Sequence, residues 1–321
     1  MLKFVAGLVA IAVLAHAQVV GVGNFIHNVA DLDKSIAFYR DVLGLQLQRP
    51  ASTFSGPPEV LNLYNAVGGE FRVGTLVIPG TPMRIELAEF RGVDRKPVRP
   101  TSGPGTSILV FQVEDLNTVL ARARAAGVKP TTPEAITVPG RHVITLPDPD
   151  GFLVQLVELV AAPDFAPSPG KAATPGGIQL TSFAYVVNDA AKFAPVFAAL
   201  GLSAKKAEAF NGSLDLHMMN VAQGTLRRTR VVVPATGDAM PFLVDVIEVR
   251  GATSFKGKGR PQDPGAAVLR LLVKDEDATV RALAAAGVKV ASAKGEIVTL
   301  PGGNRRGAPL LWAHPITCLF R

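Results

Sequence analysis

The alternation of apolar and polar residues near the start of the chain predicts one strand, one helix and three further strands. Residues 24–29 form the first expected strand. Asp31 is placed to cap a helix over about residues 32–43, because apolar residues recur there at helical spacing and Gly44 follows. Three strands are then expected at 45–48, 72–78 and 83–90. The predicted order of elements is βαβββ.

The same kind of pattern returns further along the chain. A strand is expected at 107–113 and a helix at 116–126. Two closing strands, 141–146 and 153–160, flank the segment DPDG at residues 148–151. A polar turn that ends in glycine is typical of a hairpin, so these two strands are predicted to pair.

Two sequence repeats divide the chain into four such modules. VEDLNTVLARARAAGVKP (113–130) matches VKDEDATVRALAAAGVKV (273–290) at an offset of 160 residues, and a weaker match joins 29–45 to 113–128. Between the halves, residues 163–177 are rich in Pro, Gly and Ala and predict a linker. The expected domains are residues 18–162 and residues 178–321.

The segment VADLDKSIAFYRDVLGL (29–45), the DPDG hairpin and the tandem βαβββ modules resemble the vicinal oxygen chelate superfamily. Glyoxalases, extradiol dioxygenases and bleomycin-resistance proteins belong to that superfamily. The resemblance implies an α+β fold in which modules pair and curl their mixed sheets into a cup. Four modules then give two cups in tandem. The second cup is expected to be degenerate, because NDAAKFAPVF replaces the DLDKSIAFY pattern there.

The resemblance also implies a divalent metal, zinc, nickel, manganese or iron, held by strand residues of the paired modules. The ligand positions of the first cup map to Asn24, Glu86, Ile108 and Gln155. Those of the second cup fall near Ser182, Asp245 and Val268. A 2-His-1-carboxylate iron site needs two imidazoles, and these positions hold none, so extradiol ring cleavage is not expected.

His27 is the nearest histidine to these positions. It lies three residues from Asn24, and this odd spacing places it on the opposite face of a regular strand unless a bulge turns it inward. The expected metal ligands are therefore Glu86, Gln155, Asn24 and His27, and a cup without metal is the alternative. Ligand contacts are expected from Asn28, Arg84, Gln112 and His142.

Glu86 is also a candidate catalytic base. Arg84, Glu86 and Ala88 share one face of their predicted strand. If that face lines the cup and no metal or imidazole is near, burial would raise the pKa of Glu86 into a range that suits proton abstraction next to a carbonyl. The alternative is a salt bridge with Arg84 or Arg72.

Charge and cysteine content remove several other classes of function. The chain has 33 basic and 26 acidic side chains, a net charge of +7. Its basic clusters lack interleaved aromatic residues and a nucleic-acid-binding motif, so no nucleic-acid partner is expected. A single cysteine, Cys318, excludes an intramolecular disulfide and a cysteine-rich zinc site.

The first residues have the pattern of a cleaved secretory signal. Lys3 precedes an uncharged run from Phe4 to Ala15, and small residues at Ala15 and Ala17 suit cleavage before Gln18. The apolar run is too short to span a bilayer, which takes about 20 residues. An exported protein with residues 1–17 removed is expected, without a membrane span, as a monomer or a homodimer.

Two functions remain open at this stage. As an enzyme, the protein would be a metal-dependent lyase or isomerase of the glyoxalase kind that polarises a substrate carbonyl. As a binding protein, it would hold a small molecule in a metal-free cup without turning it over. Export counts against glutathione-derived substrates, because these belong to the cytosol.

Overall fold

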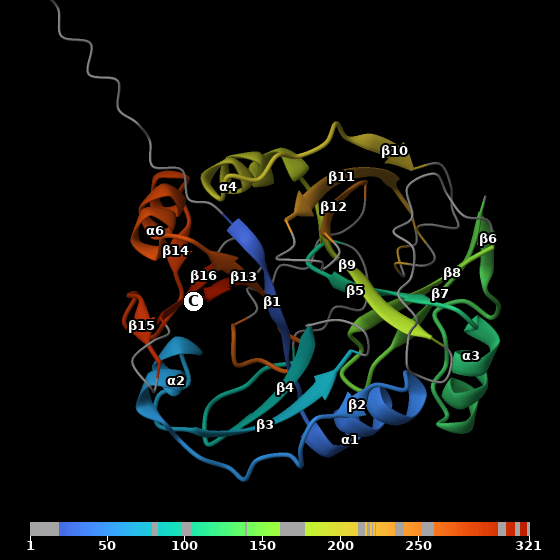
Figure 1. The fold of residues 1–321 in the computed structure, drawn as a ribbon, viewed down its shortest axis with the longest axis horizontal. Coiled ribbons are helices and arrows are strands. Elements are labelled where there is room, and N and C mark those ends of the chain that lie inside the picture. The colour runs from blue at the N-terminus through green and yellow to red at the C-terminus, as the bar shows by residue number, and fades with distance from the viewer. Residues whose placement is uncertain are drawn as a thin grey trace, which may run out of the picture.

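Four βαβββ modules build two mixed β-sheets in the computed structural model (Figure 1). The structure describes residues 19–78, 83–97, 104–138, 140–160, 177–210, 216, 219, 221, 223–234, 241–251, 260–300, 306–311 and 315–319. Curled mixed sheets with flanking helices confirm the predicted α+β class. The expected signal segment, residues 1–17, and residues 163–176 of the expected linker lie outside the described residues.

Sheet A contains strands from the first and the fourth module. Its strand order is β14 (Lys289–Val290), β16 (Arg306–Leu311), β17 (Pro315–Leu319), β13 (Ala267–Val273), β1 (Val19–Asn28), β4 (Arg84–Arg91), β3 (Glu70–Val77) and β2 (Gln46–Leu47), and β15 (Val298–Thr299) pairs with β16. The antiparallel pairing of β1 with β13 joins the two modules, with Phe25 opposite Leu269.

Sheet B contains strands from the second and the third module. Its strand order is β10 (Glu208–Phe210), β11 (Thr225–Val233), β12 (Phe242–Arg250), β9 (Ile178–Val187), β5 (Ser107–Val113), β8 (Leu153–Leu159), β7 (Arg141–Pro147) and β6 (Ile136–Val138). The antiparallel pairing of β5 with β9 joins these modules, with Leu109 opposite Phe183.

This pairing differs from the expectation that each half of the chain closes its own cup. The strands of residues 18–162 belong to both sheets, and so do those of residues 178–321. The sequence did not distinguish the two arrangements, because the first strand of every module carries a similar apolar pattern and has one edge open for a partner. The four ligand positions assigned to one cup are therefore divided between two.

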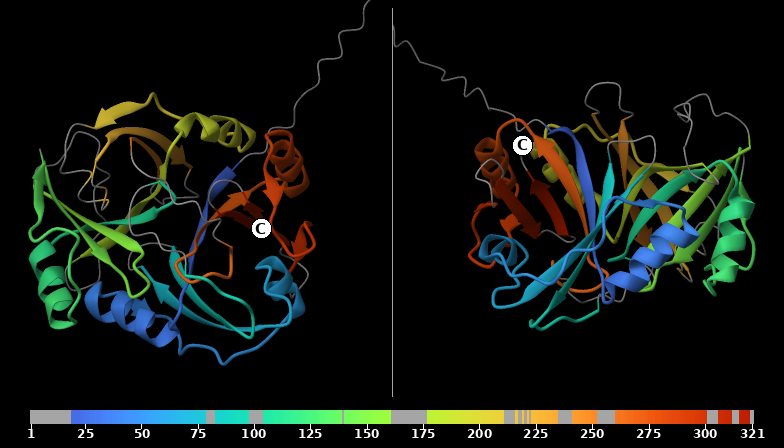
Figure 2. Two further views of the ribbon diagram at one scale, coloured as in Figure 1. Left: turned by 180° about the vertical axis from the view of Figure 1, so that it is seen from behind. Right: turned by 60° about the horizontal axis from the view of Figure 1, so that its bottom comes forward.

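The helices lie around the periphery of the sheets (Figures 1 and 2). They are α1 (Leu32–Ala37) with the π-helical turn η1 (Phe38–Val42), α2 (Pro58–Leu63), α3 (Leu116–Ala125), the 3-10 turn η2 (Ala190–Phe193) with α4 (Ala194–Ala199), and α6 (Glu276–Ala285). Helix α3 contacts η1, and α4 contacts α6. Helices thus pack within each half of the chain, whereas the strands pair between the halves.

Local sequence signals explain where these helices begin. The carboxylate of Asp31 accepts from the backbone N–H of Lys34 at 3.1 Å, and that of Asp115 accepts from the N–H of Thr118 at 3.1 Å. Such caps satisfy N–H groups that have no partner inside the helix. Gly44 follows the first helix with φ of 81°, a conformation that glycine adopts without strain.

One large apolar core fills the space between the sheets and the helices. It includes Phe25 of β1, Phe111 of β5 and Phe183 of β9, all fully buried, and the rings of Phe25 and Phe183 lie 5.4 Å apart between centroids. Two smaller apolar clusters cover the opposite faces of the sheets, one on sheet A around Ile26 and one on sheet B around Ile108. These opposite faces carry Asn24, Glu86 and Gln155 of the predicted metal set, and His27 does not lie on them.

Candidate functional site

Strand parity separates the side chains of β1 into two environments. Phe25 belongs to the large core, whereas Ile26 belongs to the cluster on the other face of sheet A. Asn24 lies on the Ile26 side, because its Nδ2 donates to Oε1 of Glu86 on β4. His27 lies on the Phe25 side and stacks against that ring. The prediction that Asn24 and His27 occupy opposite faces is confirmed.

The cup of sheet A brings Glu86 against an arginine from the fourth module. Arg270 on β13 donates through Nη2 to Oε2 of Glu86 at 3.4 Å. Glu86 thus forms an ion pair with Arg270, whereas the alternative to a catalytic role named Arg84 or Arg72 as its partner. Burial raises the pKa of the neighbouring Tyr64 to about 12, and the charge of Arg270 opposes that rise. Asn24 donates to one carboxylate oxygen of Glu86 and Arg270 donates to the other, so both oxygens have donors.

Helix α2 and residues near position 298 cover much of this cup. The ring of Tyr64 lies 5.4 Å from that of Phe90 between centroids, and Leu61, Ile26 and Val298 belong to the same buried cluster. The backbone N–H of Ala293 donates to the carbonyl of Asn62 at 2.9 Å, which ties the fourth module to the end of α2. Helix α2 was not predicted from the sequence, because six residues are too few to show a helical period.

The described side chains of the sheet A cup do not form a donor set that fits a divalent metal. The positions of this cup that correspond to the four ligand positions implied by the resemblance are Asn24, Glu86, Val268 and Thr317. Thr317 is placed by its backbone pairing with Arg270. Val268 has no donor atom, and Asn24 presents its amide nitrogen to Glu86. A divalent cation at Glu86 would also meet the positive guanidinium of Arg270. Metal sites in proteins use carboxylates, imidazoles and thiolates that are free of such competition.

The cup of sheet B contains a cavity of about 90 Å³. Its lining combines apolar side chains with a polar group that includes Gln155, Ser182 and Asp245. Asp245 is 6% exposed and forms a bidentate ion pair with Arg230, with both N–O distances at 2.8 Å. At the remaining matching position, Ile108 offers no donor atom. Among the described residues of this cup, the donors do not fit a divalent metal either, because Ile108 has no donor atom and Asp245 is held by Arg230.

The expected metal set of Glu86, Gln155, Asn24 and His27 is therefore not assembled. Glu86 and Asn24 lie in the cup of sheet A, and Gln155 lies in the cup of sheet B. His27 lies on the core side of β1. The set was derived by pairing the first module with the second, and the structure pairs the first module with the fourth.

The four expected ligand contacts have separate environments. Asn28 is buried and donates to the carbonyl of Pro261, so it holds the loop that enters β13. Arg84 donates to Gln48 at 3.2 Å near the edge of sheet A. Gln112 is half-buried on β5 opposite Gln179. His142 bonds Glu158 at 3.0 Å, and both strand neighbours of His142, but not His142 itself, line the cavity.

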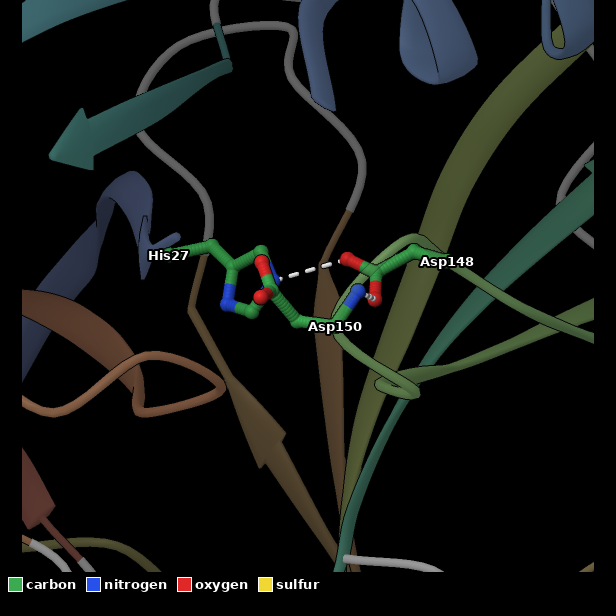
Figure 3. A group of neighbouring side chains, drawn as sticks. All are labelled: His27, Asp148 and Asp150. Atoms are coloured by element: carbon green, nitrogen blue, oxygen red, sulfur yellow. Dashed lines mark hydrogen bonds and ion pairs between the residues drawn. The ribbon is translucent and has the colours of Figure 1, made fainter. Parts of the chain in front are cut away.

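A buried polar cluster joins the two sheets on the core side (Figure 3). Nε2 of His27 lies 2.8 Å from Oδ2 of Asp148, and Tyr39 donates to the same oxygen at 3.3 Å. The backbone N–H groups of Asp150 and Phe152 donate to Oδ1 of Asp148 at 2.9 and 2.8 Å. Asp150 in turn accepts from the N–H of Ala30 at 3.2 Å. The DPDG turn of sheet B is thus fastened to β1 of sheet A.

The hydrogen bonds of His27 hold it as an imidazolium. Its Nδ1 faces the carbonyl oxygen of Ala266 at 3.2 Å and its Nε2 faces a carboxylate, so both nitrogens need a proton. Burial alone would lower the pKa of His27, but the charge and hydrogen bond of Asp148 outweigh it and raise the pKa. Burial, followed by the charge of Asp148, raises the pKa of Asp150.

This cluster has the composition of a metal site, because donor atoms of His27, Asp148 and Asp150 lie within 4.8 Å of one another. Its hydrogen bonds already use both nitrogens of His27 and both oxygens of Asp148. The side chains of His27 and Asp148 are also 0% exposed. The arrangement is that of a buried ion pair. The DPDG turn was predictable from the sequence, but no sequence signal indicates that Asp148 lies beside His27.

Comparisons with known proteins place these observations in a family. The model of the Glyoxalase/Bleomycin resistance protein/Dioxygenase superfamily matches residues 21–156. A lactoylglutathione lyase from Haemophilus influenzae is 30% identical over 131 residues, which cover 40% of this chain and 86% of that protein.

Solved structures from Zea mays show the same fold over nearly the whole chain. Glyoxalase I has a TM-score of 0.60 at 17% identity and covers 95% of this chain and 92% of its own. A point mutant of that glyoxalase I has a TM-score of 0.61 at 18% identity and covers 95% of this chain and 93% of its own. Within the residues that the structure describes, no helix is both long and apolar enough to cross a membrane.

Proposed function

Because the chain belongs to the Glyoxalase/Bleomycin resistance protein/Dioxygenase superfamily, we propose that it binds a small molecule in the cup of sheet B without a metal ion. Members of this family are often metal-dependent. The proposal departs from that pattern because of the side chains that this chain places at the ligand positions.

The observation that carries the proposal is the pairing of each cup carboxylate with an arginine. Asp245 is held by both N–H groups of the Arg230 fork, and Glu86 is held by Arg270 and Asn24. Bidentate arginine–carboxylate pairs are among the stronger hydrogen-bonded contacts in proteins. A divalent cation would have to displace the guanidinium and then lie beside its charge, which is unfavourable in a partly buried site.

The two cups differ in the room that they offer. Leu61 and Leu63 of α2 belong to the buried apolar cluster on the cup side of sheet A, and the cup of sheet B has a cavity of about 90 Å³. Sites for drug-sized ligands have about 300–1,000 Å³. A ligand of the sheet B cup must therefore be small, and the sheet A cup serves the protein as a packed support.

Metal content and ligand binding together test the proposal. Protein produced with zinc, nickel, manganese and iron is expected to hold far less than one metal ion per chain, measured by elemental mass spectrometry. Its melting temperature should not change on treatment with a chelator. Near-stoichiometric metal that disappears in Glu86→Ala or Asp245→Ala would refute the metal-free part.

A cavity-filling variant tests the place of binding. Ala184 lines the cavity and is 2% exposed, so Ala184→Phe should fill it. Compounds from a library of small metabolites that raise the melting temperature of the wild type should not raise that of this variant. Ala209→Phe, which places the same ring at an exposed position that does not line the cavity, is the matched control. If the same compounds raise the melting temperature of Ala184→Phe and of the wild type equally, the binding site is not this cavity.

A metal-dependent lyase is the second candidate function. It is favoured by the 30% identity with the lactoylglutathione lyase of Haemophilus influenzae. In this case Glu86 would act as a metal ligand or as the catalytic base. Formation of lactoylglutathione that requires added metal and is lost in Glu86→Gln would support the lyase over the binding protein.

The proposal includes export. Cleavage before Gln18 would leave β1 intact, since that strand begins at Val19. The mature protein should appear in the exported fraction with Gln18 as its first residue, as read by N-terminal sequencing. Val13→Arg, which places a charge in the apolar run, should retain the precursor inside the cell. Export of that variant at the normal rate would contradict the signal assignment.

A further inference from the structure

We infer that the ligand of the sheet B cup is a small carboxylate with an apolar body. This inference rests on the proposed function and adds the chemical class of the ligand. The charged side chains that line the cavity support this ligand class. Three arginines, Arg141, Arg228 and Arg230, line it, and Asp245 is the one acidic side chain among the described lining residues.

The arginines approach the cavity from two different modules. Arg141 begins β7 of the second module, and Arg228 and Arg230 lie on β11 of the third. In the strand order of sheet B, β7 and β11 are each next to last, at opposite ends. Because both strands contribute to one cavity, the sheet must curl until these ends face each other. A ligand in the cavity therefore meets guanidinium groups from two sides.

These arginines are not equivalent. Arg230 is committed to Asp245, which is 6% exposed, through two hydrogen bonds of 2.8 Å. Arg228 pairs with Glu208, whose side chain is 69% exposed, at 2.8 Å. Exposed ion pairs contribute little to stability, so the Arg228 fork can exchange Glu208 for a ligand carboxylate at low cost. We assign the anion to Arg228 and to Arg141, which approaches the cavity from β7 on the opposite side.

The rest of the lining selects an organic anion over an inorganic one. It consists largely of apolar side chains: Ile108, Val110, Val143, Val157, Ala184, Met219 and Ile247. Phosphate or sulfate would place polar oxygens against this surface without partners, which is unfavourable. A carboxylate presents two oxygens in one plane to a guanidinium fork and leaves the remainder of the molecule free to be apolar.

The size of the cavity limits the length of that body. The volume of about 90 Å³ is well below the roughly 300–1,000 Å³ of sites for drug-sized ligands. Affinity should therefore be highest for a short aliphatic chain and should fall once the chain exceeds the cavity.

The test uses acetate, propionate, butyrate, hexanoate and octanoate as probes, with butyramide as the neutral isostere of butyrate. Binding to the full mature chain is measured by calorimetry at two salt concentrations. Butyrate should bind at least about tenfold more tightly than butyramide. Butyrate affinity should fall as salt rises, and butyramide affinity should not. Inorganic phosphate should bind more weakly than butyrate.

Variants assign the contact to named side chains. Arg228→Met and Arg141→Met should each weaken butyrate by about tenfold or more and leave butyramide unchanged. Arg40→Met is the control, because Arg40 is exposed on η1 and pairs with Asp41 outside the cup. Circular dichroism checks that each variant is folded. If a variant does not fold, the salt dependence of butyrate binding to the wild type still tests whether the ligand is held by charge.

The outcomes separate the two proposals. Equal binding of butyrate and butyramide, or butyrate binding that is unaffected by both arginine variants, would overturn the carboxylate assignment and leave the cup as the binding site. If phosphate binds more tightly than butyrate, the inference that the ligand has an apolar body is wrong. If every compound that binds also binds Ala184→Phe equally well, the proposed function itself fails.

Discussion

Replacing Asp148 with asparagine should reverse the pH dependence that His27 gives to stability. The asparagine Oδ1 can still accept from the N–H groups of Asp150 and Phe152, but its amide now faces Nε2 of His27. Because Nδ1 of His27 faces the carbonyl of Ala266, the ring must then be neutral, with its proton on Nδ1, so that Nε2 can accept.

The sign follows from the direction of the pKa shift. In the wild type the pKa of His27 is raised above 6.5, so its stabilising contribution is complete below about pH 6.5 and is lost as pH rises through the folded-state pKa. Without the Asp148 charge, burial is the dominant influence and lowers the pKa of His27. In Asp148→Asn the contribution is therefore complete above about pH 6.5 and is lost as pH falls.

The magnitude follows from the contacts that change. At about pH 8 the variant exchanges charge-assisted hydrogen bonds for neutral ones, a loss of about 1–2 kcal/mol. At about pH 5.5 the wild type keeps the full contribution of its imidazolium, whereas the buried ring of the variant stays neutral while the unfolded chain takes up a proton. The loss therefore rises to about 3–5 kcal/mol. One titrating group can change the free energy of unfolding by at most about 3.4 kcal/mol over this interval, which accommodates the difference.

Urea unfolding followed by circular dichroism at both pH values measures these losses. Asp150→Asn is the matched control from the same turn. The pKa of Asp150 is raised, so its charged form is disfavoured in the folded state, and this variant should be no less stable than the wild type at about pH 8. A loss in Asp148→Asn that is the same at both pH values would refute the assignment of His27 as an imidazolium.

Three further substitutions test the packing and the caps by urea unfolding. Phe152→Ala should cost about 3–5 kcal/mol, because the ring is 1% exposed and lies 4.7 Å from the ring of His27; a loss below about 1 kcal/mol would contradict that packing. Asp115→Ala should lower the free energy of unfolding by about 1 kcal/mol, because it removes the cap of α3; an unchanged stability would contradict the role of this cap. Gly69→Ala should cost about 1–3 kcal/mol, since its methyl group would lie 2.7 Å from the carbonyl oxygen of Arg91; an unchanged variant would show that this turn can yield.

Local structure was predictable where a short stretch of sequence determines it. Asp31 and Asp115 precede apolar residues at helical spacing and cap the helices that follow, and the DPDG segment closes a hairpin as expected. Parity along β1 correctly placed Asn24 and His27 on opposite faces. Each of these outcomes depends on residues only a few positions apart.

The composition of the site was not predictable, because it depends on which modules pair. Glu86 and Asn24 were correctly expected to face the same cup, but their third partner, Arg270, comes from the last module. Gln155 belongs to the other sheet for the same reason. The repeats make the four modules alike, so nothing local to β1 identifies β13 as its neighbour. Packing over the whole chain makes that choice.

The first module pairs with the fourth and the second pairs with the third, and this order affects folding during synthesis. Phe25 pairs with Leu269, 244 residues later, whereas Leu109 pairs with Phe183, 74 residues later. The entropy of closing the longer loop is greater by about 1 kcal/mol. Sheet B can therefore form while the ribosome is still adding the fourth module. Strand β1 must meanwhile keep one edge unpaired, so chaperone binding during synthesis is expected to concentrate on the first module.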